Sequence, residues 1–236
     1  MSTTLSKRQR LVLMKAHHEI ERATFLPTWR DCGDFTWPTR QRYEITDVNR
    51  GDRRNLKIID STATYAARTL RSGMMSGVTS PARPWFRLTT PDPDLARFGP
   101  VKEWTHFVTQ RMQTAFIRSN LYTTLPGVYG DMGVFGTAAM LIEEDPDSVI
   151  RTFSYPIGSY MLSNNDKLQI DTYIREFQLT VRQIVEKFAR VKDTGHIDWS
   201  NISEVVQRAW ENSEYETWIS ICHSIYPNPD YDPNRS

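Results

Sequence analysis

The sequence predicts an α+β protein in which N-terminal helices are followed by an antiparallel sheet with inserted helices. Apolar residues recur at three- and four-residue spacing through residues 1–132, as they do along amphipathic helices. From Gly133 onward, short segments alternate apolar and polar residues, which is typical of half-buried strands. Thr180 and Gln183 fit a capping box, which places a helix among those strands. The chain is therefore divided into a mainly helical part, residues 1–132, and a mixed sheet and helix part, residues 133–236.

The helical part is expected to hold five helices separated by polar or proline-rich segments. Residues 38–55 are predicted to form a loop and residues 89–100 a turn punctuated by prolines. A short aromatic strand is expected at Trp85–Leu88. Pro126 is expected near the start of its helix or at a bend in it. The five helices are expected at residues 5–22, 25–35, 60–75, 101–118 and 121–132.

The helix at residues 60–75 is unusually rich in small side chains. Small residues let another backbone approach closely, so we expect this helix to be packed on several sides. Gly73 and Gly77 have the spacing of a membrane dimerisation motif, but their polar flanks favour an ordinary helix end.

The mixed part is expected to contain five strands and two helices. The string SNND at residues 163–166 is a hairpin signal between two of the strands. The strands are expected at residues 137–143, 149–153, 160–163, 168–177 and 215–226, and the helices from residue 180 to 188 and from 198 to 212.

Composition is that of an ordinary soluble globular protein, with 24% charged and 39% hydrophobic residues. No run approaches the ~20 apolar residues that a membrane helix needs, and the N-terminus lacks the features of a signal peptide. Cys32 and Cys222 lie far apart in the sequence. Two buried thiols in a reducing compartment are favoured, with a disulfide left open.

The net charge of +1 hides an asymmetry between the two ends of the chain. Residues 1–90 hold 16 Lys and Arg against 8 Asp and Glu, whereas residues 91–236 hold 13 against 20. A basic run occupies residues 40–57, where it can track phosphates without reading a base sequence. The alternative is a set of salt bridges, within or between subunits, to Asp47, Asp52 and Asp60. The candidate DNA-backbone or subunit-interface residues are Arg40, Arg42, Arg50, Arg53, Arg54 and Lys57.

No pattern in the chain predicts catalysis. The glycines at 130, 133 and 136 are not followed by the Lys-Ser/Thr pair of a phosphate loop. His17 and His18 are adjacent and point to different helix faces, so they do not converge on a metal. The acidic residues at 143–147 are better explained by a solvated hairpin turn than by a cation site or a metal-dependent nuclease. We expect no enzyme activity, no cofactor and no bound metal.

Several long strings in this chain are far more specific than any short motif. The longest is NRGDRRNLKIIDSTATYAARTLRSGMMSGVTSPARPWFRL at residues 49–88. The others are LPTWRD (26–31), VTQRM and RSNLY (within 108–122), YGDMGVFGTAAMLIEED (129–145), PIGSYML (156–162), REFQLTVRQIVEKF (175–188) and HSIYPNPD (223–230). Together, in this order and at near-native spacing, they resemble the head-to-tail connecting, or portal, protein of short-tailed bacteriophages.

This resemblance implies a structural subunit of a ring, usually of twelve copies, at one vertex of the capsid. Double-stranded DNA would be packaged and ejected through the ring, and terminase, capsid or scaffold, and tail adaptor proteins would be its partners. The protein would be found in the virion after assembly in the host cytoplasm. Family members are roughly twice as long, so the chain is expected to be a fragment that corresponds to the N-terminal part of the portal wing. The alternative function is a nucleic-acid-binding module without sequence specificity that uses the basic run at 40–57.

Overall fold

The computed structural model describes residues 6–44, 51, 53–191 and 197–228, which fall into two compact units. The helical unit is drawn from Phe25–Arg42 and Asn49–Gly158. The sheet unit is drawn from Met1–Thr24, Tyr43–Val48 and Ser159–Ser236. Each unit combines segments that are distant in sequence. The division expected at residue 132 is of a different kind, because it separates the chain by its content of helices and strands.

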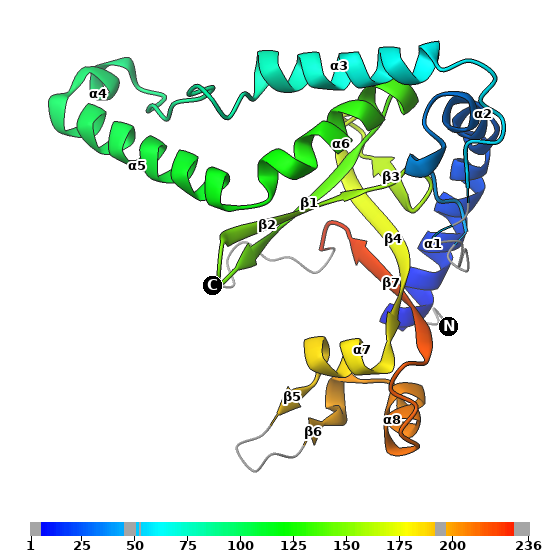
Figure 1. Cartoon of the computed structure of the whole chain (residues 1–236). Helices are drawn as coiled ribbons and strands as arrows, with labels where there is room; N and C mark the ends of the chain where they lie inside the picture. The colour runs from blue at the N-terminus through cyan, green and yellow to red at the C-terminus, as the bar shows by residue number, and fades with distance from the viewer. Residues whose placement is uncertain (1–5, 45–50, 52, 192–196, 229–236) are drawn as a thin grey trace. The chain divides into compact units, whose positions relative to one another are not determined.

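The helical unit pairs a set of helices with one antiparallel hairpin (Figure 1). The hairpin, β1–β2, runs in register from Ala139 opposite Tyr155 to Asp145 opposite Val149. The elements of the helical unit are α2 (Leu26–Thr36), the 3-10 helix η1 (Pro38–Arg40), α3 (Thr62–Val78), α4 (Pro93–Arg97), α5 (Gly99–Arg118), α6 (Leu121–Phe135), β1 (Ala139–Asp145) and β2 (Val149–Tyr155).

Helix α6 carries the core of the helical unit. Leu121, Leu125 and Tyr129 are buried at one-turn spacing and form a cluster with half-buried methionines of α3. The Tyr129 hydroxyl shares a 2.9 Å hydrogen bond with Thr79, the residue that caps the C-terminal end of α3. Pro126 lies inside α6 beyond its first turn. The apolar spacing thus predicted the helix, although Met132 at its end is 48% exposed.

The sheet unit is built on a three-stranded antiparallel sheet of order β3-β4-β7. Thr180 and Gln183 form the predicted capping box, which starts α7 where β4 ends. The buried core of the sheet unit includes Val181, Ile184, Val185, Val206 and Ala209. The elements are α1 (Lys7–Ala23), β3 (Tyr160–Asn164), β4 (Ile170–Thr180), α7 (Val181–Phe188), β5 (Arg190–Val191), β6 (Ile197–Asp198), the 3-10 helix η2 (Trp199–Asn201), α8 (Glu204–Glu211) and β7 (Trp218–Ile225).

The predicted α+β fold class is confirmed, since helices precede antiparallel sheets along the chain. None of the described helices is both long enough and apolar enough to cross a membrane. Neither cysteine is in a disulfide, and Cys222 is exposed where a buried thiol was expected.

Several local expectations were wrong. The turn expected at 89–100 holds α4 and the start of α5, and the loop expected at 38–55 begins with η1. Trp85–Leu88 is not a strand, because side chains of α5 and α6 take its polar groups: Leu88 N–H donates to Thr109, and the Trp85 indole donates to Tyr122. The helix expected at 198–212 is split into β6, η2 and α8. Helix α3 is not enclosed on several sides, because none of its residues is fully buried.

Candidate functional site

Arg40, the first residue of the predicted basic run, is bound inside the helical unit. Its guanidinium donates to both carboxylate oxygens of Asp131, with Nε 2.9 Å from Oδ1 and Nη2 2.8 Å from Oδ2, and also to Ser154. Asp131 is fully buried on α6. Burial raises the pKa of Asp131 to about 6, although the ion pair with Arg40 opposes this shift. The pair therefore connects η1, α6 and β2 across the interior of the unit.

Lys57 is also paired with a carboxylate. Its Nζ lies 2.7 Å from Asp34 Oδ2, and this contact holds the pKa of Asp34 below its usual value. Salt bridges do form, but with Asp34 and Asp131. The expected partner Asp60 instead accepts the backbone N–H of Thr62, and the other two expected partners, at positions 47 and 52, lie outside the described residues.

The described contacts of the remaining members of the basic run are with backbone groups or an amide side chain. Arg54 donates to the backbone oxygen of Gln41 at 3.3 Å, and the exposed Arg53 donates to Asn55 at 2.7 Å. The backbone N–H of Arg42 donates to Ile157. Arg50 lies outside the described residues. The run thus contains one interior ion pair, one surface ion pair and further side chains near the surface, and its role in contacts with DNA or subunits stays a prediction.

A second group of arginines, which the sequence analysis did not single out, surrounds Trp37. The Arg71 guanidinium carbon lies 5.0 Å from the centroid of the Trp37 ring, and the Arg68 carbon lies 5.6 Å from that of Tyr65. These side chains border a small cavity of about 50 Å³ between the end of α2 and the first half of α3. The cavity is lined by Thr36, Trp37, Thr64, Ala67, Arg68 and Arg71.

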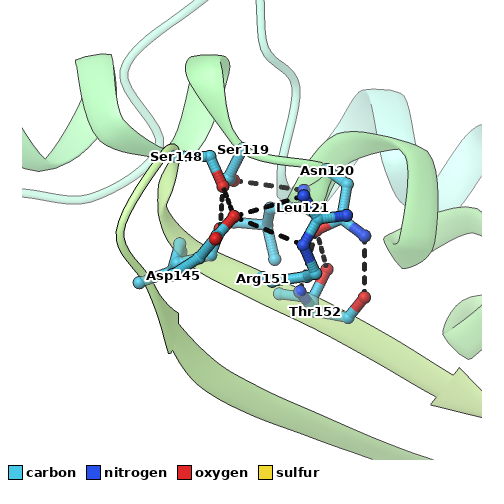
Figure 2. A network of polar contacts seen from close by, with 8 residues as sticks. Ser119, Asn120, Leu121, Asp145, Ser148, Arg151 and Thr152 are labelled. Atoms are coloured by element: carbon cyan, nitrogen blue, oxygen red, sulfur yellow. Dashed lines mark hydrogen bonds and ion pairs between the residues drawn. The ribbon is translucent and has the colours of Figure 1, made fainter. Parts of the chain in front are cut away.

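The junction between α5 and α6 is bonded to strand β2 through one amide side chain (Figure 2). Asn120 donates from Nδ2 to the backbone oxygen of Thr152 at 2.7 Å, and its Oδ1 accepts the Thr152 N–H at 2.8 Å. The Thr152 hydroxyl also donates to Asn120 and lies 3.0 Å from that of Thr124. Asn120 therefore satisfies both backbone groups of a buried residue, as a neighbouring strand would.

The turn of the β1–β2 hairpin is stabilised by Asp145, as Figure 2 also shows. The Ser148 hydroxyl lies 2.5 Å from Asp145 Oδ2, and Arg151 Nη2 lies 3.2 Å from the same oxygen. These donors hold the pKa of Asp145 below its usual value. The acidic stretch at 143–147 belongs to the hairpin: Glu143, Glu144 and Asp145 end β1, and Asp147 lies in the turn that follows.

Among the residues that the structure describes, no three His, Cys, Asp or Glu side chains lie together in a way that could hold a metal ion. His17 is exposed and His18 is half-buried, consistent with side chains on different faces of α1.

Comparison with known proteins gives a consistent result over nearly the whole chain. A family model described as "Bacteriophage head to tail connecting protein" matches residues 10–236. The portal protein of Salmonella phage epsilon15 is 47% identical over 230 residues, which cover 98% of this chain. A probable portal protein of Bordetella phage BPP-1 is 38% identical over 215 residues, or 91% of the chain. The matched regions make up 40% and 37% of these relatives, so the chain spans well under half of their length.

Proposed function

We propose, from the premise that this chain belongs to the bacteriophage head to tail connecting protein family, that it is part of a structural subunit of a portal ring. The ring would occupy one capsid vertex, contain twelve copies, and carry double-stranded DNA during packaging and ejection. The family match over residues 10–236 is the observation that carries this proposal. Terminase, capsid or scaffold, and tail adaptor proteins would contact the ring, which would belong to the virion and assemble in the host cytoplasm.

Exposed apolar residues on α5 support an assembled state. Trp104 is 66% exposed and Phe107 is 56% exposed, one turn apart on the same helix. Contiguous apolar surface on a soluble protein usually marks an interaction site. A ring subunit, which contacts a copy on either side, needs such surface.

The basic run contributes less to this function than its charge suggests. Arg40 and Lys57 are bound to carboxylates, so we do not advance an independent nucleic-acid module based on this run. The exposed Arg53 remains a proposed contact with the DNA backbone or a neighbouring subunit, together with Arg42, Arg50 and Arg54.

Electron microscopy and native mass measurement of the full-length protein test the proposal. We expect closed rings whose mass is twelve times that of the subunit. A different whole-number multiple would correct the copy number and leave the ring in place. A protein that remains monomeric under all assembly conditions would remove the proposed function.

A further inference from the structure

Arg68 and Arg71 differ from Arg40 and Lys57 of the basic run in having no carboxylate partner among the described residues. Neither forms an ion pair in the part of the chain that the structure describes, and their contacts are with the aromatic rings of Tyr65 and Trp37. They lie three residues apart on α3, so both side chains project on the same side of the helix. Two neighbouring positive charges without a counter-charge form a site for an anionic group.

The cavity beside them fits one small anionic group. Its volume of about 50 Å³ exceeds that of a single water site. The Trp37 ring under the Arg71 guanidinium limits the movement of this side chain and leaves its N–H groups as donors. Arginine presents these donors as a planar fork that matches a carboxylate.

The chain itself carries an acidic group of complementary form at the β1–β2 turn. Glu144 and Asp147 are exposed and have no ion pair among the residues described, whereas Asp145 between them is bound to Ser148 and Arg151. Asp145 therefore keeps the turn ordered while its two neighbours face solvent. Ile142 and Val149, which flank the turn, are 54% and 58% exposed.

We propose that the acidic turn Glu144–Asp147 of one copy docks onto Arg68, Arg71 and Trp37 of the next copy in the ring. This inference rests on the proposed ring function and assigns one of its subunit contacts. Within the helical unit, the β1–β2 turn lies at the far end of the hairpin from α2 and the first half of α3 (Figure 1). A copy therefore cannot fill its own cavity. Contacts between two different surfaces repeat head to tail and close into a ring when the rotation allows it.

The surroundings favour a protein carboxylate over a DNA phosphate. Tyr65, beside Arg68, is 59% exposed, and Trp37 and Ala67 line the cavity. Exposed Tyr, Trp and Arg side chains are the residue types that dominate protein–protein contacts. The exposed apolar residues next to the acidic turn give the partner a matching apolar component.

Charge reversal on the full-length protein tests the pairing. One variant carries Arg68→Glu and Arg71→Glu, a second carries Glu144→Lys and Asp147→Lys, and a third carries all four changes. Sedimentation velocity over a concentration series gives the concentration of half-maximal ring formation. We expect each two-site variant to raise it at least about tenfold, and the four-site variant to return most of the way to wild type. The control variants Arg8→Glu with Arg10→Glu, and Asp166→Lys, change exposed charges elsewhere and should assemble as wild type does.

Two further measurements guard against misfolding. Arg68→Glu alone changes an exposed side chain and should show the same direction of effect with an unchanged melting temperature. In a Cys222→Ser background, copies with Arg68→Cys mixed with copies with Asp147→Cys should form a disulfide-linked dimer, and neither should do so alone.

The outcomes separate this inference from the proposed function. If the wild-type protein forms no ring, the proposed function falls before the variants are considered. If wild-type rings form and the reversed variants assemble equally well, the docking contact is overturned and the ring stands. Failure of the four-site variant to recover, or of the mixed cysteines to cross-link, would show that these surfaces do not meet. Loss of salt-dependent DNA binding by the Arg68 and Arg71 variant with normal assembly would assign the cavity to phosphate and also overturn the inference.

Discussion

Arg40 and Arg71 both lie next to Trp37, yet their environments are opposite. The backbone N–H of Arg40 donates to the Trp37 carbonyl, and its guanidinium points inward to the buried Asp131. The Arg71 guanidinium lies over the Trp37 ring beside an open cavity, with no carboxylate partner among the described residues. The difference shows that clustering of basic residues in a sequence does not identify those that are available for a partner. Which basic residues are available depends on whether the fold places a carboxylate next to them.

Removing Arg40 is expected to have the largest effect. Arg40→Ala leaves the carboxylate of Asp131 buried without its partner, which should lower the free energy of unfolding by about 3–5 kcal/mol. Arg68→Ala, at an exposed site, should change it by no more than about 0.5 kcal/mol. Urea denaturation of both variants measures the two values. Equal losses in the free energy of unfolding would show that the two environments do not differ in their contribution to stability.

Gly130 of α6 tests how tightly the ring of Trp37, which lies next to both Arg40 and Arg71, is held. A Cβ at Gly130 would overlap the Trp37 ring, so Gly130→Ala should destabilise the protein by about 1–3 kcal/mol. Gly73→Ala is the matched control, because it also lies inside a helix but has open space around it. In the control, the free energy of unfolding should rise by about 0.5–1 kcal/mol, because alanine has a higher helix propensity than glycine. Thermal unfolding distinguishes these opposite signs, and a gain in both variants would mean that Trp37 moves aside freely.

The raised pKa of Asp131 predicts a pH dependence with a defined direction. Between about pH 4 and 6 the folded protein holds a proton on Asp131 that the unfolded chain has released. The stability contributed by this group therefore falls as pH rises toward and through about 6, by at most about 1.4 kcal/mol per pH unit. Asp131→Asn should remove this slope. The carboxylates with lowered pKa, Asp34 and Asp145, act in the opposite sense at lower pH, so the difference between wild type and Asp131→Asn is the quantity to measure. An identical slope in both proteins would contradict the assignment.

The contact between Arg71 and Trp37 should contribute least to folding. Arg71→Gln removes the guanidinium from the ring face and should cost about 0.5–1 kcal/mol in denaturant titrations. Arg111, which lies 4.7 Å from the Phe107 centroid, supplies a control in Arg111→Gln at a comparable contact. A cost for Arg71→Gln near that of Arg40→Ala would show that Arg71 is a structural residue rather than a side chain available for docking.

Much of the fold was predictable because its signals are local. The capping box at Thr180 and Gln183 depends on residues three apart, and the alternation in β4 follows from one buried face. The prediction of a strand at Trp85–Leu88 was wrong. The Leu88 N–H and the Trp85 indole bond to side chains of α5 and α6, and no local pattern encodes these contacts. The helix expected at 198–212 was split because the Asp198 side chain accepts the Ser200 N–H and starts a separate 3-10 turn, while Arg190 pairs with Asp198 in a small sheet.

The site was less predictable than the fold, because it depends on contacts between distant residues. Asp131 is separated from Arg40 by 91 positions. Its segment contains glycines at 127, 130 and 133 and gives no sign that a buried charge lies there. The spacing of Arg68 and Arg71 was visible in the sequence, but the lack of a carboxylate nearby is a property of the folded chain. Two arginines three residues apart on a predicted helix were the signal that could have been followed.

The side chain of Asn120 also protects the hairpin that it contacts. A two-stranded ribbon leaves backbone groups along its outer edges, where the strands of other molecules can add and begin aggregation. Because Asn120 occupies both the N–H and the C=O of Thr152, no incoming strand can pair with β2 at that position. Monomers that wait to assemble would be kept from edge-to-edge association at this point by a single amide group.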